Sequence, residues 1–172
     1  DDHIGRVLSA LDDSGLAKDT MVVFSSDNGP VWYDRDVDRF DHDSSGGLRG
    51  MKADAWECGH RMPFIVRWPG KVNPGSVSHQ MIGFTDVMAT LGAVAEIPLP
   101  ADAAPDSFDF SSVLLGNREE GNPIRDSLVV YSGGGVATIR QGAWKLIQGL
   151  GSGGFSQPRR VQATPDGPKG QL

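Results

Sequence analysis

The stretch MVVFSSDNGP, residues 21–30, joins a short apolar run to a polar turn. Residues 20–24 are rich in β-branched side chains and do not alternate, which is typical of a strand buried on both faces in a parallel sheet. Asp27 and Asn28 then stand just past the carboxyl end of that strand, where open α/β sheets bind ligands. Two interpretations are open here: a turn, which Asp-Asn and Asn-Gly favour, or a site for a hard metal ion such as calcium or magnesium.

Helical periodicity precedes this strand. Ile4, Val7, Leu8 and Leu11 recur at the spacing of one face of an amphipathic helix, and Gly15 suits its C-terminal cap. A helix followed by a buried strand is characteristic of an α/β fold.

The segment after the strand is long and aperiodic. Residues 28–62 are rich in Asp, Gly and Arg, and a loop of this length is expected to be functional or disordered. A second strand is predicted over residues 64–68. Thr85 is the expected N-cap of a helix that runs to about residue 95.

The C-terminal part has a different pattern. Three short β-prone runs are separated by glycine turns, which predicts an antiparallel meander. The runs cover residues 128–131, 136–140 and 143–147. From residue 149 the chain is rich in Gly and Pro, which predicts a surface excursion.

Composition excludes several classes of function. The net charge of −6 and the lack of a basic stripe argue against nucleic-acid binding. No segment approaches the roughly 20 apolar residues that span a bilayer, so we expect no membrane partner. The single cysteine, Cys58, excludes an internal disulfide.

A second polar constellation follows the strand end, GGLRGMKADAWECGHRMPFIVRWPGKV, residues 46–72. Its glycines let the backbone approach a ligand, and Lys52, Arg49 and Arg61 could meet an anion. Taken alone, the stretch is better explained as a solvated loop that ends in a turn.

Together the two stretches resemble the sulfatase family of the alkaline phosphatase superfamily. That family has a strand ending in Ser-Asp-Asn-Gly, then Gly-x-Lys, Glu-Gly-Gly-x-Arg-x-Pro and a Trp-Pro-Gly turn. Four matches in one order are far more specific than any of them alone. They are Ser26-Asp27-Asn28-Gly29, Gly50-Met51-Lys52, Glu57-Cys58-Gly59-His60-Arg61-Met62-Pro63 and Trp68-Pro69-Gly70.

The resemblance implies roles for individual residues. Asp27 and Asn28 match a pair of Ca²⁺ ligands, and Lys52 matches the lysine that contacts the substrate sulfate. Arg61 and His42 are further candidates for contact with substrate, although His42 could also be a loop histidine bonded to a neighbouring aspartate. In the family a formylglycine attacks sulfur while cations hold the sulfate oxygens, so developing charge meets preorganised positive groups.

The departures from the family pattern also matter. Formylglycine comes from a Cys/Ser-x-Pro-Ser/Ala-Arg motif, which this sequence lacks, and Cys58 stands where the family usually has glycine. We interpret Cys58 as packed, not nucleophilic. The chain therefore resembles a C-terminal part of a sulfatase, with the nucleophile expected in a missing N-terminal part. By itself it is expected to be inactive.

The resemblance also implies a fold and a partner. The expected fold is α/β: the C-terminal part of an alkaline-phosphatase-like α/β sandwich over residues 1–100, a connector over 101–127, and a small, incomplete antiparallel β subdomain over 128–172. The expected substrate is a sulfated small molecule or carbohydrate, in a periplasmic, secreted or lysosomal setting. The oligomeric state is not indicated by the sequence.

Two alternative functions stay open. A phosphate- or phosphonate-ester hydrolase of the same superfamily would share the metal pair. A non-catalytic binding or interaction module would keep the fold without the chemistry.

Overall fold

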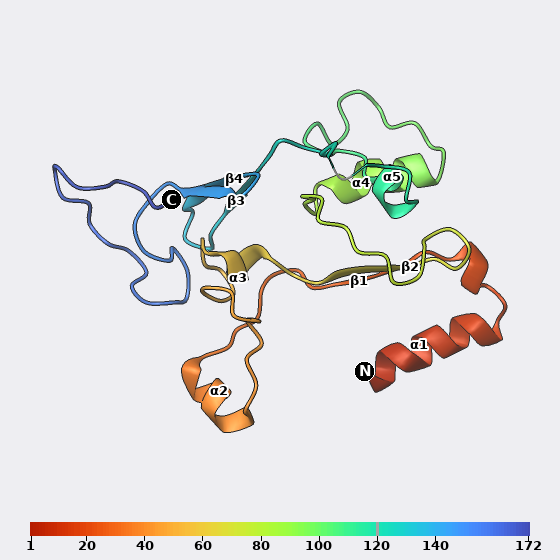
Figure 1. The fold of residues 1–172 in the computed structure, drawn as a ribbon, viewed down its shortest axis with the longest axis horizontal. Coiled ribbons are helices and arrows are strands. Elements are labelled where there is room, and N and C mark those ends of the chain that lie inside the picture. The colour runs from red at the N-terminus through yellow and green to blue at the C-terminus, as the bar shows by residue number, and fades with distance from the viewer. Residues whose placement is uncertain (120) are drawn as a thin grey trace. The chain divides into compact units, whose positions relative to one another are not determined.

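The computed structural model describes residues 1–119 and 121–172 (Figure 1). The chain divides into two compact units, and each unit is built from two separate stretches of sequence. The first unit comprises Asp1–Phe24 and Phe64–Arg125, and the second comprises Ser25–Pro63 and Asp126–Leu172. The domain boundaries expected from sequence stay a prediction. Within the described residues, no helix is long and apolar enough to cross a membrane.

The elements follow one another as short helices and strands. Their order is α1 (Asp2–Asp13), η1 (Ala17–Asp19), β1 (Val22–Ser25), α2 (Asp34–Phe40), α3 (Glu57–His60), β2 (Phe64–Arg67), α4 (Asp86–Val94), α5 (Ser111–Leu114), β3 (Ser127–Tyr131), β4 (Ala137–Gln141) and β5 (Trp144–Ile147).

Helix α1 contains the predicted apolar face and ends just before Gly15, as the sequence predicts. Gly15 follows it with φ +73°, and its N–H donates to the Asp12 carbonyl at 3.1 Å. Strand β1 pairs with β2 in a two-stranded sheet. Val23 and Phe24 are each 42% exposed, so the predicted burial of β1 on both faces is not met within this chain. A two-strand sheet offers too little surface to cover both faces of a strand.

Packing in the first unit centres on three phenylalanines. The Phe64 ring lies 5.8 Å from Phe110 and 6.4 Å from Phe84, between centroids. Phe110 is 2% exposed and is the N-cap residue of α5. Such aromatic contacts add about 0.5–1.5 kcal/mol per pair beyond burial of their area.

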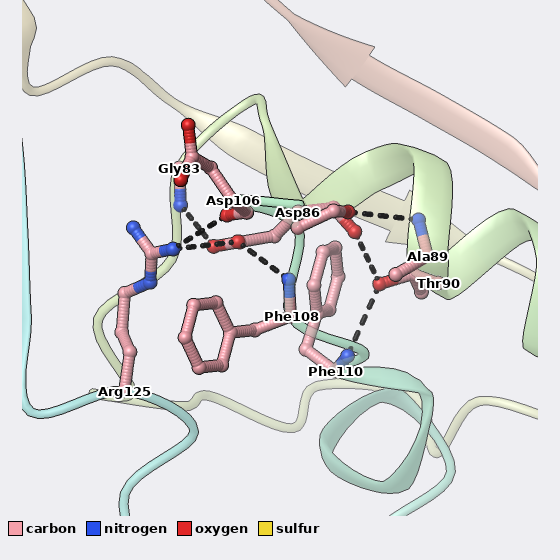
Figure 2. Close-up of polar contacts among 9 residues, drawn as sticks. Gly83, Asp86, Ala89, Thr90, Asp106, Phe108, Phe110 and Arg125 are labelled. Carbon is pink, nitrogen blue, oxygen red and sulfur yellow. Dashed lines mark hydrogen bonds and ion pairs between the residues drawn. The ribbon is translucent and has the colours of Figure 1, made fainter. Parts of the chain in front are cut away.

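A buried carboxylate ties the start of α4 to the segments around it (Figure 2). Asp86 accepts the Gly83 N–H at 2.7 Å and the Phe108 N–H at 3.0 Å. Arg125 pairs with Asp86 at 3.1 Å and also donates to the Asp106 carbonyl at 3.0 Å. Thr85 is the N-cap as predicted, but its side chain makes no cap hydrogen bond. The neighbouring Asp86 binds a backbone N–H there instead.

The second unit contains the predicted meander. Strands β3, β4 and β5 pair antiparallel in sequence order, with Val129 opposite Ile139 and Arg140 opposite Lys145. Ile147, at the end of β5, packs with Trp56 to form the small core of this unit.

Two expectations for the loops hold only in part. Residues 28–62 are not wholly irregular, because they contain α2 and α3. Asp36 accepts the Tyr33 N–H at 3.1 Å, and acidic residues in the first turn of α2 suit the helix dipole. The stretch after residue 149 is not simply a surface excursion, since residues 151–153 are buried. Their backbone bonds to other loops, including Ser152 N–H to the Pro158 carbonyl at 2.9 Å.

Candidate functional site

Two backbone hydrogen bonds bring the predicted motifs together inside the second unit. The Gly29 N–H donates to the Gly59 carbonyl at 3.2 Å, and the Lys52 N–H donates to the Pro30 carbonyl at 2.7 Å. The strand end therefore lies against both the lysine turn and α3. These three segments come from separate places in the sequence, so their meeting is a property of the fold.

The backbone at Gly29 lies so close to the backbone at Cys58 that there is no room for a side chain at Gly29. Gly29 is buried, and a Cβ added there would lie 1.7 Å from the Cys58 carbonyl oxygen. Just before it, the Ser26 hydroxyl donates to the Asn28 carbonyl at 2.9 Å. The chain bends at Asp27-Asn28, which agrees with the turn interpretation as local geometry and does not exclude a metal role.

The side chains of this pair are available to a ligand. Asp27 is exposed and Asn28 is half-buried. Across residues 1–119 and 121–172, no group of three or more His, Cys, Asp or Glu side chains could hold a metal ion. Calcium takes about six to eight oxygen ligands, so Asp27 and Asn28 fit a calcium site only as part of its ligand set.

The turn that carries Lys52 is strained. Ala53 has φ +70°, a left-handed conformation that costs an L-residue about 1–2 kcal/mol. Gly50 has φ +90°, and a Cβ there would lie 2.7 Å from an Asp54 carboxyl oxygen. Strain of this kind persists only where the surroundings hold it, and it is frequent at functional sites.

The three cations of this region differ in their contacts. The Arg49 guanidinium lies over the Trp56 ring, 3.8 Å from its centroid. Lys52 is half-buried and Arg61 is exposed, and within the described chain neither has an ion-pair partner. The structure leaves these two positive groups available to an anion, whereas Arg49 is engaged in packing.

A charged cluster that sequence reasoning did not identify holds α3. Glu57, in the first turn of α3, forms ion pairs with Arg140 and with Lys145, the latter at 3.9 Å. Arg140 and Lys145 are cross-strand neighbours on β4 and β5. Burial lowers the pKa of Lys145, and the Glu57 carboxylate opposes that shift. The motif includes Glu57, but no local signal indicates its partners on β4 and β5.

His60 and Cys58 flank the Gly59 carbonyl. Burial, followed by the charge of Lys145, lowers the pKa of His60. Its Nε2 is buried and has no hydrogen-bond partner among the residues that the structure describes. Cys58 is 1% exposed, and burial raises the pKa of its thiol. A buried thiol with a raised pKa agrees with the interpretation of Cys58 as packed.

His42 lies beside α2. Its ring meets the Trp32 ring edge-on at 5.9 Å, and the Trp32 indole N–H donates to the His42 carbonyl at 2.7 Å. His42 itself is exposed. Asp43 accepts the backbone N–H of Ser45, and the hydrogen bonds from Ser45 lower the pKa of Asp43.

Comparison with known proteins identifies relatives of this chain. The Sulfatase family profile matches residues 1–97. An N-acetylgalactosamine-6-O-sulfatase of Bacteroides thetaiotaomicron is 38% identical over 150 residues, covering 84% of this chain and 29% of that protein. Human arylsulfatase A is 36% identical over 151 residues, covering 84% of this chain and 28% of that protein.

Solved structures give the same result. A Bacteroides thetaiotaomicron protein from a locus for glycosaminoglycan metabolism superposes with a TM-score of 0.75 at 38% identity, covering 84% of this chain and 30% of that chain. A Pseudoalteromonas sulfatase superposes with a TM-score of 0.69 at 25% identity, covering 91% of this chain and 30% of that chain. The 172 residues thus span somewhat under a third of the length of these relatives.

Proposed function

The chain belongs to the sulfatase family, and from this premise we propose that it forms part of an enzyme that hydrolyses sulfate esters to an alcohol and inorganic sulfate. The solved relatives confirm the predicted fold class, the C-terminal part of an alkaline-phosphatase-like α/β fold followed by a small antiparallel sheet. The observation that carries the proposal is the pair of backbone hydrogen bonds that join the strand end to Lys52 and to Gly59.

In this proposal Lys52 binds the sulfate group. Its ammonium is half-buried and has no ion-pair partner in the described part of the chain, so an anion would supply the missing partner. Negative charge that develops on the transferring group is stabilised most by cations that are already in place. Arg61 adds a second cation, and His42 contacts the part of the substrate beyond the sulfate.

Asp27 and Asn28 would supply two oxygen ligands to Ca²⁺. When bound, the ion supplies charge stabilisation at the sulfate oxygens. The remaining ligands and the formylglycine nucleophile belong, in this proposal, to sequence that the relatives have and these 172 residues do not include. The close backbone contact of Gly29 with Cys58 and Gly59 holds Asp27 and Asn28 in place.

The substrate class that we propose is a sulfated carbohydrate or a sulfated small molecule. The Bacteroides relative is named for a 6-O-sulfated amino sugar, and the human relative for aryl sulfates. Tyr33 and Phe40, at the two ends of α2, have exposed rings that could pack against a sugar ring.

The test uses the full-length enzyme, meaning this chain joined to the portion that carries the nucleophile. Hydrolysis of an aryl sulfate and of a 6-sulfated amino sugar is measured for the wild type, Lys52→Ala and Asp27→Ala. We expect Lys52→Ala to lower kcat/KM by about 100-fold, the size of effect found when one charge-stabilising donor is removed. Asp27→Ala is expected to raise the calcium concentration needed for half-maximal activity. The surface lysine Lys71, as Lys71→Ala, is the matched control.

Three results would contradict the proposal. They are unchanged kinetics in Lys52→Ala, a preference for phosphate over sulfate esters, and turnover by the purified 172-residue chain alone. The first would remove Lys52 from the site, the second would favour the phosphoesterase alternative, and the third would place a nucleophile inside this sequence.

A further inference from the structure

The turn that carries Lys52 is built around one fully buried carboxyl group. Asp54 is 0% exposed, and both of its carboxyl oxygens accept backbone hydrogen bonds. One accepts the Met51 N–H at 2.9 Å, within the turn, and the other accepts the Ser156 N–H at 3.0 Å, from a distant loop. A single side chain therefore joins the Lys52 turn to the C-terminal loop.

Backbone contacts reinforce this link from the same two sides. The Gly133 N–H donates to the Ala53 carbonyl at 2.8 Å, and the Ala55 N–H donates to the Ser152 carbonyl at 2.6 Å. The loops that hold the turn thus follow β3 and β5, and both belong to the second unit with the turn itself.

The fit around the turn is too close for extra atoms. A Cβ added at Gly154 would lie 2.5 Å from an Asp54 carboxyl oxygen. One added at Gly133 would lie 2.8 Å from the Ala53 Cβ. Since Ala53 has φ +70°, the turn needs this support to keep its conformation.

We propose that Asp54 is a positioning residue for Lys52: its buried carboxyl group fastens residues 50–54 to the loop at residues 151–156, and so fixes where the Lys52 ammonium is presented. The β subdomain thereby takes part in sulfate binding without contacting sulfate. This inference rests on the proposed function, in which Lys52 binds the sulfate group.

Positioning and simple electrostatics predict opposite results for Asp54→Asn. The substitution removes a negative charge two residues from Lys52, and lower repulsion by itself would strengthen the binding of an anion. Loss of positioning weakens it, because the amide nitrogen cannot accept an N–H and the turn loosens. The sign of the change therefore distinguishes the two effects.

The experiment measures KM, kcat and inhibition by inorganic sulfate in the full-length enzyme, with concentrations normalised by titration of active sites. We expect Asp54→Asn to raise KM and the inhibition constant for sulfate by about tenfold, less than the roughly 100-fold that a misplacement of about 1 Å can cost. A change in folding alone would lower the number of active sites and leave KM where it was. Asp109→Asn is the matched control, because exposed Asp109 also accepts hydrogen bonds through both carboxyl oxygens.

A second variant reaches the same turn without touching Asp54. Gly133→Ala forces its new methyl against Ala53, and we expect the same rise in the sulfate inhibition constant. Gly121→Ala is its control, since a Cβ at Gly121 meets nothing within 4 Å. If Asp54→Asn does not fold, Gly133→Ala alone decides the outcome.

A double substitution shows whether Asp54 acts through Lys52. In the Lys52→Ala background, Asp54→Asn should add little, because the group that it positions is gone. The inference is overturned by equal effects of Asp54→Asn in both backgrounds, or by tighter or unchanged sulfate inhibition in the single variants. If Lys52→Ala itself leaves sulfate inhibition unchanged, it is the proposed function that fails.

Discussion

Asp86 in the first unit and Asp54 in the second are both fully buried aspartates, but their partners differ. Asp86 has the Arg125 guanidinium at 3.1 Å in addition to two backbone N–H donors. Asp54 has backbone donors, and in the described chain no cation pairs with it. The Arg125 guanidinium beside Asp86 also lies over the Phe108 ring, 4.6 Å from its centroid.

If Asp54 is the positioning residue proposed above, the two aspartates differ in role: Asp86 stabilises the fold and Asp54 serves the site. Around Asp86, opposite charges satisfy each other, which serves the packing of α4 against its neighbours. Around Asp54, the nearest cation in the sequence is Lys52, which lies half-buried and is not paired with the carboxyl group. A positive group without an ion-pair partner in the described chain is available to an anionic ligand, and the carboxyl group of Asp54 binds backbone N–H groups instead of that cation.

The largest effect is expected at the buried ion pair of Asp86 and Arg125. Asp86→Ala removes one partner and leaves the Arg125 charge buried, which costs about 3–5 kcal/mol of unfolding free energy. Urea unfolding of the chain measures the loss.

An exposed ion pair of the same unit supplies the control. Asp12 and Arg67 lie 2.8 Å apart but are partly exposed, so Asp12→Ala should cost at most about 1 kcal/mol. Equal losses of unfolding free energy in Asp86→Ala and Asp12→Ala would mean that the buried ion pair of Asp86 stabilises the fold no more than an exposed one.

The sequence predicts local features of both regions. Helix α1, the cap position at Thr85 and the three antiparallel strands follow from periodicity and turn residues, which depend on near neighbours. The motifs indicate Asp27, Asn28 and Lys52 as site residues, and the backbone hydrogen bonds of Pro30 and Gly29 bring those motifs together. Their chemical roles remain predictions.

Long-range partners could not be predicted in the same way. Asp54 stands in the sequence as one acidic residue in a polar loop, and its burial depends on Ser156, far along the chain. The pairing of Glu57 with Arg140 likewise forms only when β4 reaches α3. Burial of a charge is a tertiary property, so neither propensity nor spacing indicates it.

A smaller effect is expected in the second unit, at the strand end. Gly29→Ala would place its methyl against the Cys58 carbonyl, and backbone cannot move aside as a flexible side chain can. Overpacking of this kind costs about 1–3 kcal/mol, and here it would also displace Asn28. Thermal unfolding measures the cost.

A second glycine tests whether the cost comes from the clash. Gly5, within α1, has nothing within 4 Å of an added Cβ, so Gly5→Ala should stabilise the chain by up to about 1 kcal/mol. A Gly29→Ala variant as stable as the wild type would show that the strand end is not held tightly.

The smallest effect concerns His60, whose lowered pKa follows from burial and from the charge of Lys145. Because the folded state resists protonation, His60 is neutral in both states above its ordinary pKa of 6.5 and costs nothing there. As pH falls below that value, His60 binds a proton more readily in the unfolded chain than in the folded chain, and the unfolding free energy decreases.

His60→Gln should therefore reduce the loss of stability between about pH 7 and 5. Urea midpoints across that range measure it, with the exposed His79 as His79→Gln for calibration. If both variants change the pH dependence equally, the burial of His60 makes no contribution of its own to the pH dependence of stability.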